Sequence, residues 1–263
     1  MAKVFVITSG KGGVGKTTTT ANLGVGLAIR GKRTLLIDAD IGLRNLDVVM
    51  GLENRIVYDL VDVIEGKCRM KQAFIKDKRC ENLFLLPAAQ TRDKDAVSPE
   101  QMKTLIAALK EEFDYIIIDC PAGIERGFKN AISAADQAFI VTTPEISAVR
   151  DADRIIGLLE ANEIRNSKLI VNRIKTHMVK EGNMLDVPDI TDILGIDVIG
   201  VVPDDEIIVI STNKGEPLIY KGNSLAAQAY NNISQRAMGD DVDFLNLETN
   251  EGLFSMLKGI FKR

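Results

Sequence analysis

Residues that build metal clusters and disulfide frameworks are scarce in this sequence. It contains one histidine, three cysteines and no tryptophan in 263 residues. The cysteines, Cys68, Cys80 and Cys120, are odd in number and lack C-x-x-C spacing, which argues against a disulfide framework or a zinc site. His177 has no cluster of partners at ligand spacing, so we expect a loop or surface histidine. The cysteine usage favours a reducing compartment, and we expect a cytoplasmic protein.

Long apolar runs and an excess of positive charge are also missing. No run reaches the roughly 18 apolar residues that a membrane-spanning helix needs. The opening MAKVFVITSG does not resemble a secretory signal. The 33 basic and 37 acidic residues give a formal net charge of −4, which argues against non-specific contact with nucleic acid. We therefore expect no nucleic acid partner.

Short apolar runs alternate with helical patterns along most of the chain. The runs are nearly all apolar, as in a parallel sheet that is covered on both faces. The expected strands are Val4–Thr8, Thr34–Asp38, Leu83–Leu86, Tyr115–Asp119, Ala138–Thr142, Lys168–Asn172 and Val198–Val202. The expected helices lie near Thr17–Arg30, Pro99–Glu112, Ala148–Asn162 and Ser224–Ala237. This alternation predicts one doubly wound, mostly parallel α/β domain over residues 1–239.

The strongest motif is G-x-x-x-x-G-K-[ST] at residues 10–17, directly after a predicted strand and at the start of a predicted helix. Glycines let successive backbone N–H groups turn toward an anion, and the helix N-terminus adds partial positive charge. Lys16 is expected to reach the β- and γ-phosphates, and the Thr17 hydroxyl to bind Mg²⁺. The residues expected to bind the nucleotide here are Gly10, Lys11, Gly12, Gly13, Val14, Gly15, Lys16, Thr17 and Thr18.

A second lysine, Lys11, lies inside this loop. A buried ammonium without a partner is costly, so Lys11 needs an anion other than the phosphates that Lys16 serves. The phosphate bound by a second copy of the chain is one candidate, and Lys11 would then act in trans. The alternative is a lysine exposed to solvent.

Three carboxylates end predicted strands near the loop. Asp38 and Asp40 follow one apolar strand and Asp119 ends another, in the form of a Walker B element. We expect Thr17 and Asp119 to hold the metal, with Asp40 orienting the attacking water and also near the metal, and Asp38 supporting the metal shell. Cys120-Pro121-Ala122-Gly123 suits a switch that senses the γ-phosphate, with Cys120 a small buried residue.

The composition changes after Gly239. Residues 240–251 are acidic and lack helical periodicity, so we expect a solvated tether. Residues 252–263 form an amphipathic pattern whose apolar arc spans roughly 160°. The expected membrane contacts are Leu253, Phe254, Leu257, Lys258, Ile260 and Phe261. One such tail is a weak anchor, and two tails on a dimer bind with higher avidity. The alternative is a last helix docked on the protein's own core.

Several segments resemble the MinD/ParA family of deviant Walker A P-loop ATPases, especially those that place the bacterial division site. These segments are GKGGVGKTT, IDADIGLRNLD, PAAQTRDKDA, DCPAGIERG, TTPEISAVRDADRI and NKGEP, and the likeness runs nearly end to end. The resemblance implies a homodimer formed with ATP and Mg²⁺ in which Lys11 crosses the interface. It also implies that Asn172 and the loop from Pro203 recognise adenine, and that Asp151 pairs with Lys11 when no nucleotide is bound.

The same resemblance implies partners. They are an anionic membrane surface on the inner face of the cell membrane in the ATP state, a MinC-type division inhibitor and, in some lineages, a MinE-type activator. The rival interpretation is a ParA-like DNA-partition ATPase, against which the net charge and the amphipathic tail weigh. An iron–sulfur carrier ATPase lacks the cysteine pair it needs, and a tyrosine-kinase relative lacks tyrosines in the tail. A nucleotide-gated scaffold without catalysis would not need the three carboxylates.

Overall fold

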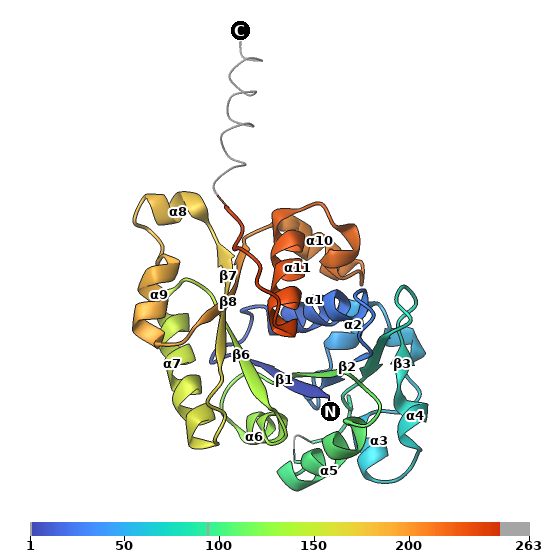
Figure 1. Cartoon of the computed structure of the whole chain (residues 1–263). Helices are drawn as coiled ribbons and strands as arrows, with labels where there is room; N and C mark the ends of the chain where they lie inside the picture. The colour runs from blue at the N-terminus through green and yellow to red at the C-terminus, as the bar shows by residue number, and fades with distance from the viewer. Residues whose placement is uncertain (1, 94, 248–263) are drawn as a thin grey trace.

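A central sheet of eight strands separates two layers of helices in the computed structural model, which describes residues 2–93 and 95–247 (Figure 1). The strand order is β3-β4-β2-β5-β1-β6-β7-β8, and every neighbouring pair is parallel except the antiparallel pair β3 and β4. The strands are β1 Lys3–Thr8, β2 Thr34–Asp38, β3 Ile75–Lys76, β4 Leu83–Leu86, β5 Tyr115–Asp119, β6 Gln137–Thr142, β7 Lys168–Ile174 and β8 Val198–Pro203.

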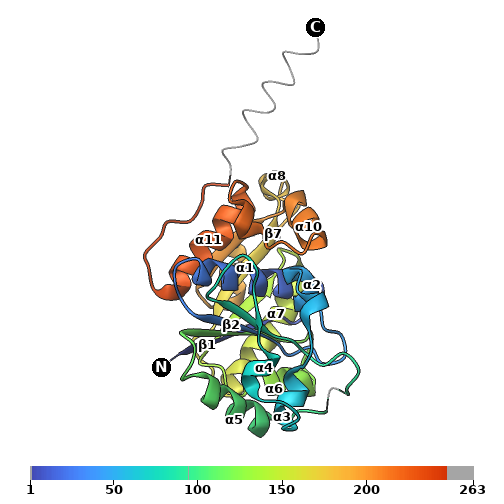
Figure 2. The same cartoon turned by 90° about the vertical axis from the view of Figure 1, so that its right-hand side faces the viewer.

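Helices cover both faces of the sheet (Figures 1 and 2). One layer contains α1 Lys16–Ala28, α2 Leu46–Met50, η1 Glu53–Arg55, α10 Glu206–Asn213, η2 Leu218–Lys221 and α11 Leu225–Met238. The other contains α3 Leu60–Ile64, α4 Met70–Ala73, α5 Pro99–Leu109, α6 Arg126–Ile132, α7 Ile146–Ala161 and α9 Val187–Leu194, with α8 Thr176–Lys180 beside it. The expected doubly wound α/β fold is therefore confirmed.

A hydrophobic core lies between the sheet and each layer of helices, and successive residues of the central strands pack alternately into the two cores. Val4 and Val6 of β1 pack in one core, whereas Phe5 and Ile7 pack in the other. Burying each such side chain contributes about 1.5–3 kcal/mol, so apolar residues are favoured on both faces. This is the reason that the strands have continuous rather than alternating apolar sequences.

The expected strands all form, with ends within two residues of the predicted ones. The edge strand β3 was not predicted, since two residues carry no periodicity. The predicted helix start at Pro99 is confirmed: the Ser98 side chain caps α5 by accepting a bond from the Gln101 N–H at 3.2 Å. The short helices α2–α4, α6 and α8–α10 were also missed.

The sheet brings three key positions to one edge. In the parallel register Ile7 pairs with Asp119, and Asp38 pairs with Asp119 from the other side. The carboxyl ends of β1, β2 and β5 therefore meet, with the loop after β1 between them. Open α/β sheets bind ligands at this edge.

The chain leaves α11 at Gly239 and runs without helix to residue 247. Arg236 holds the first part of this segment. Its guanidinium donates to the carbonyls of Val242 and Asp243 at 2.9 and 2.8 Å, and lies over the Phe244 ring at 3.9 Å. The start of the expected tether therefore packs on the domain. The predicted amphipathic helix, with Leu253, Phe254, Leu257, Lys258, Ile260 and Phe261, lies outside the described residues.

Among the described residues, no helix combines the length and apolarity needed to cross a membrane.

Candidate nucleotide site

The loop between β1 and α1 has the backbone of an anion-binding turn. Gly13 and Gly15 have φ angles of 77° and 100°, in the left-handed region where a side chain is strained. Gly15 is also the N-cap of α1, and no side chain caps this helix. The first N–H groups of α1 are thus left for a ligand, and the helix dipole favours a negative one.

Lys16 lies inside this turn. It is only 8% exposed, and its Nζ donates to the Ser9 hydroxyl at 3.0 Å. The Ser9 hydroxyl donates in turn to the Lys11 carbonyl at 2.7 Å. These two hydrogen bonds fix the Lys16 ammonium next to the N–H groups of the loop. The negative charge of a bound phosphate would offset the positive charge of this ammonium. Ser9 was not among the predicted residues.

Lys11 lies on the outside of the loop. Its side chain is 48% exposed, and its Nζ is 3.8 Å from a Glu145 carboxylate oxygen. In a single chain this side of the loop therefore faces solvent, and the expected action of Lys11 in a second chain stays a prediction. The pairing with Asp151 is not found among the described residues. Asp151 instead packs against Gly10, where an added Cβ would lie 2.3 Å from the Asp151 carbonyl oxygen.

Asp38 is buried and holds the loop that follows β2. Its Oδ1 accepts the Asp40 N–H at 2.9 Å, and its Oδ2 accepts the N–H groups of Asn45 and Leu46, both at 3.1 Å. Burial raises the pKa of Asp38, while these N–H donors lower it. Both carboxylate oxygens are thus occupied by backbone. This arrangement favours positioning of Asp40 over the support of the metal shell expected for Asp38.

Asp119 faces the start of α1. The Thr20 hydroxyl donates to its carboxylate at 3.1 Å. Burial and the negative charge of Asp38 raise the pKa of Asp119, and Thr17 and the Lys16 cation oppose this rise. Thr20 was not predicted, because its contact depends on how α1 packs on β5.

These residues fit Mg²⁺. Two buried carboxylates on adjacent strands concentrate negative charge that a divalent cation would offset, and Thr17 is near enough to Asp119 to lower the pKa of that carboxyl. In the described part of the chain, no group of three or more histidine, cysteine and acidic side chains could hold a metal by itself. Mg²⁺ sites commonly take one or two protein oxygens and complete the shell with phosphates and water. Asp40, half-buried, lies next to this site.

Asn172 and Pro203, the two residues expected to recognise the adenine base, lie near the ends of the neighbouring strands β7 and β8. Pro203 pairs in register with Ile174, two residues beyond Asn172. Asn172 is 3% exposed and contacts the phosphate loop directly: its Nδ2 donates to the Val14 carbonyl at 2.8 Å. This contact was not foreseen.

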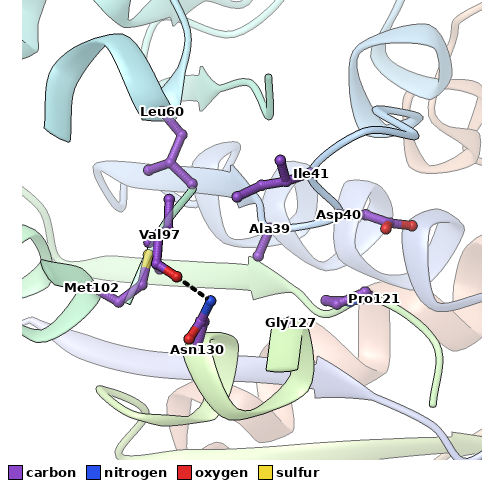
Figure 3. Close-up of a pocket in the computed structure, with 9 residues that line it drawn as sticks. All are labelled: Ala39, Asp40, Ile41, Leu60, Val97, Met102, Pro121, Gly127 and Asn130. Atoms are coloured by element: carbon purple, nitrogen blue, oxygen red, sulfur yellow. Dashed lines mark hydrogen bonds between the residues drawn. The ribbon is translucent and has the colours of Figure 1, made fainter. Parts of the chain in front are cut away.

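A small, mostly apolar pocket lies beside the segments that follow β2 and β5 (Figure 3). Its lining residues are Ala39, Asp40, Ile41, Leu60, Val97, Met102, Pro121, Gly127 and Asn130. The Asp40 carboxylate points away from Val97 and Met102 (Figure 3). An added Cβ at Gly127 would lie 2.8 Å from the Pro121 side chain, so α6 packs closely on the predicted switch segment.

The remaining residues of interest are structural. His177 is exposed on α8, as expected. Cys120 is buried as expected, and burial raises the pKa of its thiol to about 12.

Comparisons with known proteins agree with this geometry. A family model described as "AAA domain" matches residues 2–172. The septum site-determining protein MinD of Bacillus subtilis (strain 168) is 59% identical over 264 residues, covering 99% of this chain and 98% of its own length. The solved MinC:MinD cell division protein complex of Aquifex aeolicus matches with TM-score 0.88 and 52% identity, covering 93% and 99% of the two chains.

A solved MinD from Pyrococcus horikoshii, complexed with Mg-ADP, is 31% identical with a TM-score of 0.81. The match covers 90% of this chain and 96% of that one.

Proposed function

The chain belongs to the MinD family of septum site-determining ATPases, and from this premise we propose that it hydrolyses Mg-ATP as a homodimer that attaches to the membrane. At the membrane it recruits a division inhibitor and so places the division site. The observation that carries the proposal is the pair of lysines in one phosphate loop. Lys16 is buried against Ser9, whereas Lys11 is half exposed.

The residues of one subunit provide most of the hydrolytic site. Phosphoryl transfer to water needs an in-line nucleophile and neutralisation of charge on the γ-phosphate oxygens. Thr17 and Asp119 would hold Mg²⁺, and the bound ion would neutralise negative charge on the phosphate oxygens. Lys16 and the loop N–H groups bind the same phosphates. Asp40, fixed through its backbone by Asp38, orients the attacking water.

A second subunit supplies the missing cation. Lys11 projects outward from the loop, where the exposed Glu145 is its partner in the single chain. In a dimer with two facing phosphate loops, each Lys11 would exchange Glu145 for the phosphates of the opposite site. The site is then complete only when two loaded chains are paired, and hydrolysis depends on dimerisation.

Membrane attachment follows from the predicted tail. The apolar arc with Phe254 and Phe261 enters the lipid interface, and Lys258 meets anionic headgroups. Pairing places two tails on one particle, so ATP-driven dimerisation strengthens binding and hydrolysis releases it.

The proposed protein partner is a MinC-type division inhibitor. The support is the Aquifex aeolicus relative, which was solved as a MinC:MinD complex. A MinE-type activator is the second partner that we propose from the family, since its stimulation of hydrolysis would release the dimer from the membrane.

Phosphate release from Mg-ATP, measured with and without anionic vesicles, tests the proposal. We expect hydrolysis that rises with chain concentration and with vesicles, and no hydrolysis by Lys16→Ala. Duplex DNA added in place of vesicles is expected to have no effect. Absence of hydrolysis under every condition would refute the proposed activity, and stimulation by DNA alone would favour the DNA-partition alternative.

A further inference from the structure

One side-chain amide joins the end of β7 to the phosphate loop. The Asn172 Nδ2 donates to the Val14 carbonyl at 2.8 Å, and the Asn172 Oδ1 accepts the Arg173 N–H at 3.0 Å. Asn172 is 3% exposed and its bond to Val14 is buried, whereas its bond from the exposed Arg173 is only partly buried. A buried donor or acceptor that loses its partner keeps its full cost of desolvation, so this amide is held firmly in place.

The backbone around Asn172 is irregular in a way that aims the side chain at the loop. The register between β7 and β8 shifts between Val171 and Ile174. Arg173 has a φ of 59°, in the left-handed region that residues other than glycine rarely adopt. In this irregular segment the Arg173 N–H donates to the Asn172 Oδ1. The backbone at Arg173 is thus strained, and the Asn172 amide beside it is held in one orientation by its two hydrogen bonds.

The amide also occupies the space beside the loop. An added Cβ at Gly15 would lie 2.4 Å from the Asn172 Nδ2, too close for any side chain at that position. Gly15 is therefore required here both for its φ of 100° and for the approach of Asn172. The contact falls directly before Lys16 and Thr17.

A glycine-rich loop needs such a link to keep its N–H groups aimed at phosphates. Glycine has the greatest backbone freedom of all residues, so a glycine-rich loop loses the most conformational entropy when it is ordered. On the side of the loop next to β1, the Ser9 hydroxyl contacts Lys11 and Lys16. On the side next to β7, the described contact is the bond from Asn172 to Val14.

We propose that Asn172 is a positioning residue of the phosphate loop, and that it acts on the affinity for phosphates whether or not a base is attached. The inference rests on the proposed nucleotide-binding function. It is separate from the contact with adenine that the family resemblance implies, because a residue that only reads the base has no effect on a ligand without one.

The chain offers a matched control. Asn22 is also buried, donates from Nδ2 to the Thr18 carbonyl at 2.8 Å, and accepts the Ile219 N–H at 3.0 Å. Like Asn172, it donates to one backbone carbonyl and accepts one backbone N–H, but it joins α1 to η2 and does not contact the phosphate loop at Val14. Loss of the Asn22 amide therefore reproduces the cost of removing a buried amide without touching the Val14 carbonyl.

The experiment measures the affinities of the full chain for Mg-ATP and for Mg-tripolyphosphate by calorimetry. The chains are the parent, Asn172→Leu, Asn172→Ser, Asn22→Leu and Asn22→Ser, each checked for folding by its thermal unfolding curve. We expect both Asn172 variants to bind both ligands about tenfold more weakly or worse, corresponding to the loss of one buried hydrogen bond. The Asn22 variants are expected to keep parental affinities.

Three results would overturn the inference. The first is loss of affinity for ATP with unchanged affinity for tripolyphosphate, which would make Asn172 a reader of the base. The second is an equal loss in the Asn22 variants. The third is failure of both Asn172 variants to fold while the Asn22 variants fold. If the parent chain bound neither ligand, the proposed function itself would fail.

Discussion

Replacement of Lys11 by alanine separates the contribution of this lysine to folding from its contribution to catalysis. The Lys11 and Glu145 side chains are 48% and 59% exposed and their charged atoms are 3.8 Å apart. Exposed ion pairs are worth about 0–1 kcal/mol, and this long, screened pair belongs at the lower end. We therefore expect the free energy of unfolding of Lys11→Ala to lie within about 0.5 kcal/mol of the parent value.

The effect on hydrolysis is expected to be far larger. A cation supplied in trans to the transferring phosphate accounts for roughly 10³-fold or more in rate, by analogy with arginine fingers. Lys16, buried beside Ser9, is the lysine that we propose binds the phosphates of its own subunit. The assay is phosphate release at saturating Mg-ATP and at a chain concentration where the parent rate no longer rises.

A mixing experiment shows in which subunit Lys11 acts. Asp40→Ala lacks the residue proposed to orient the water but keeps Lys11, so it can complete the site of a Lys11→Ala partner. Random pairing of equal amounts leaves one working site in about half of the dimers, so about a quarter of the parent rate per chain should return. No recovery in the mixture, or a loss of stability as large as the loss of rate, would refute the trans role.

Three further changes probe other parts of the chain. Phe254→Glu should reduce binding to anionic vesicles more than about tenfold and leave ATP binding unchanged, whereas Asn250→Glu, outside the apolar arc, should keep both. Sedimentation with vesicles measures the binding. Equal binding by the parent and the two variants would exclude the tail as the membrane contact. Arg236→Ala should raise the rate of chymotryptic cleavage after Phe244 about tenfold or more, because it frees the segment that the Arg236 side chain binds. Mass spectrometry follows the cleavage. An unchanged rate would contradict the role of Arg236 in holding this segment. Burial raises the pKa of Asp47 above 3.8, so the folded state disfavours its charged form and Asp47→Asn should be more stable than the parent at pH 8. This difference should shrink as the pH falls toward 3.8, where protonation removes the cost; a difference that grows in urea titrations at lower pH would contradict it.

The sheet could be predicted from the sequence because its strands are buried on both faces. Such strands have continuous apolar sequences, and their ends fall within two residues of the predicted ones. The helices of four to eight residues, such as α2 and α6, complete too few turns to show a period of 3.6 residues. Their positions depend on packing and hydrogen bonds with distant segments, which no local pattern contains.

In the candidate site, too, the parts formed by consecutive residues could be predicted from the sequence, whereas the contacts between distant segments could not. The phosphate loop could be predicted because its chemistry lies in eight consecutive residues, 10–17. The contacts of Thr20 with Asp119 and of Asn172 with Val14 join segments 99 and 158 residues apart, and they exist only once the strands are ordered. Whether Lys11 is buried or exposed stayed open, because the sequence does not tell which side of the loop faces solvent.

The central claim is that a triphosphate held between two chains turns a weak lipid contact into attachment. Flotation of the full chain with anionic liposomes, in ADP and in a slowly hydrolysed ATP analogue, tests it most directly. We expect the chain to float with the liposomes in the analogue and to remain in the soluble fraction in ADP. Equal flotation in the two nucleotides would contradict the claim.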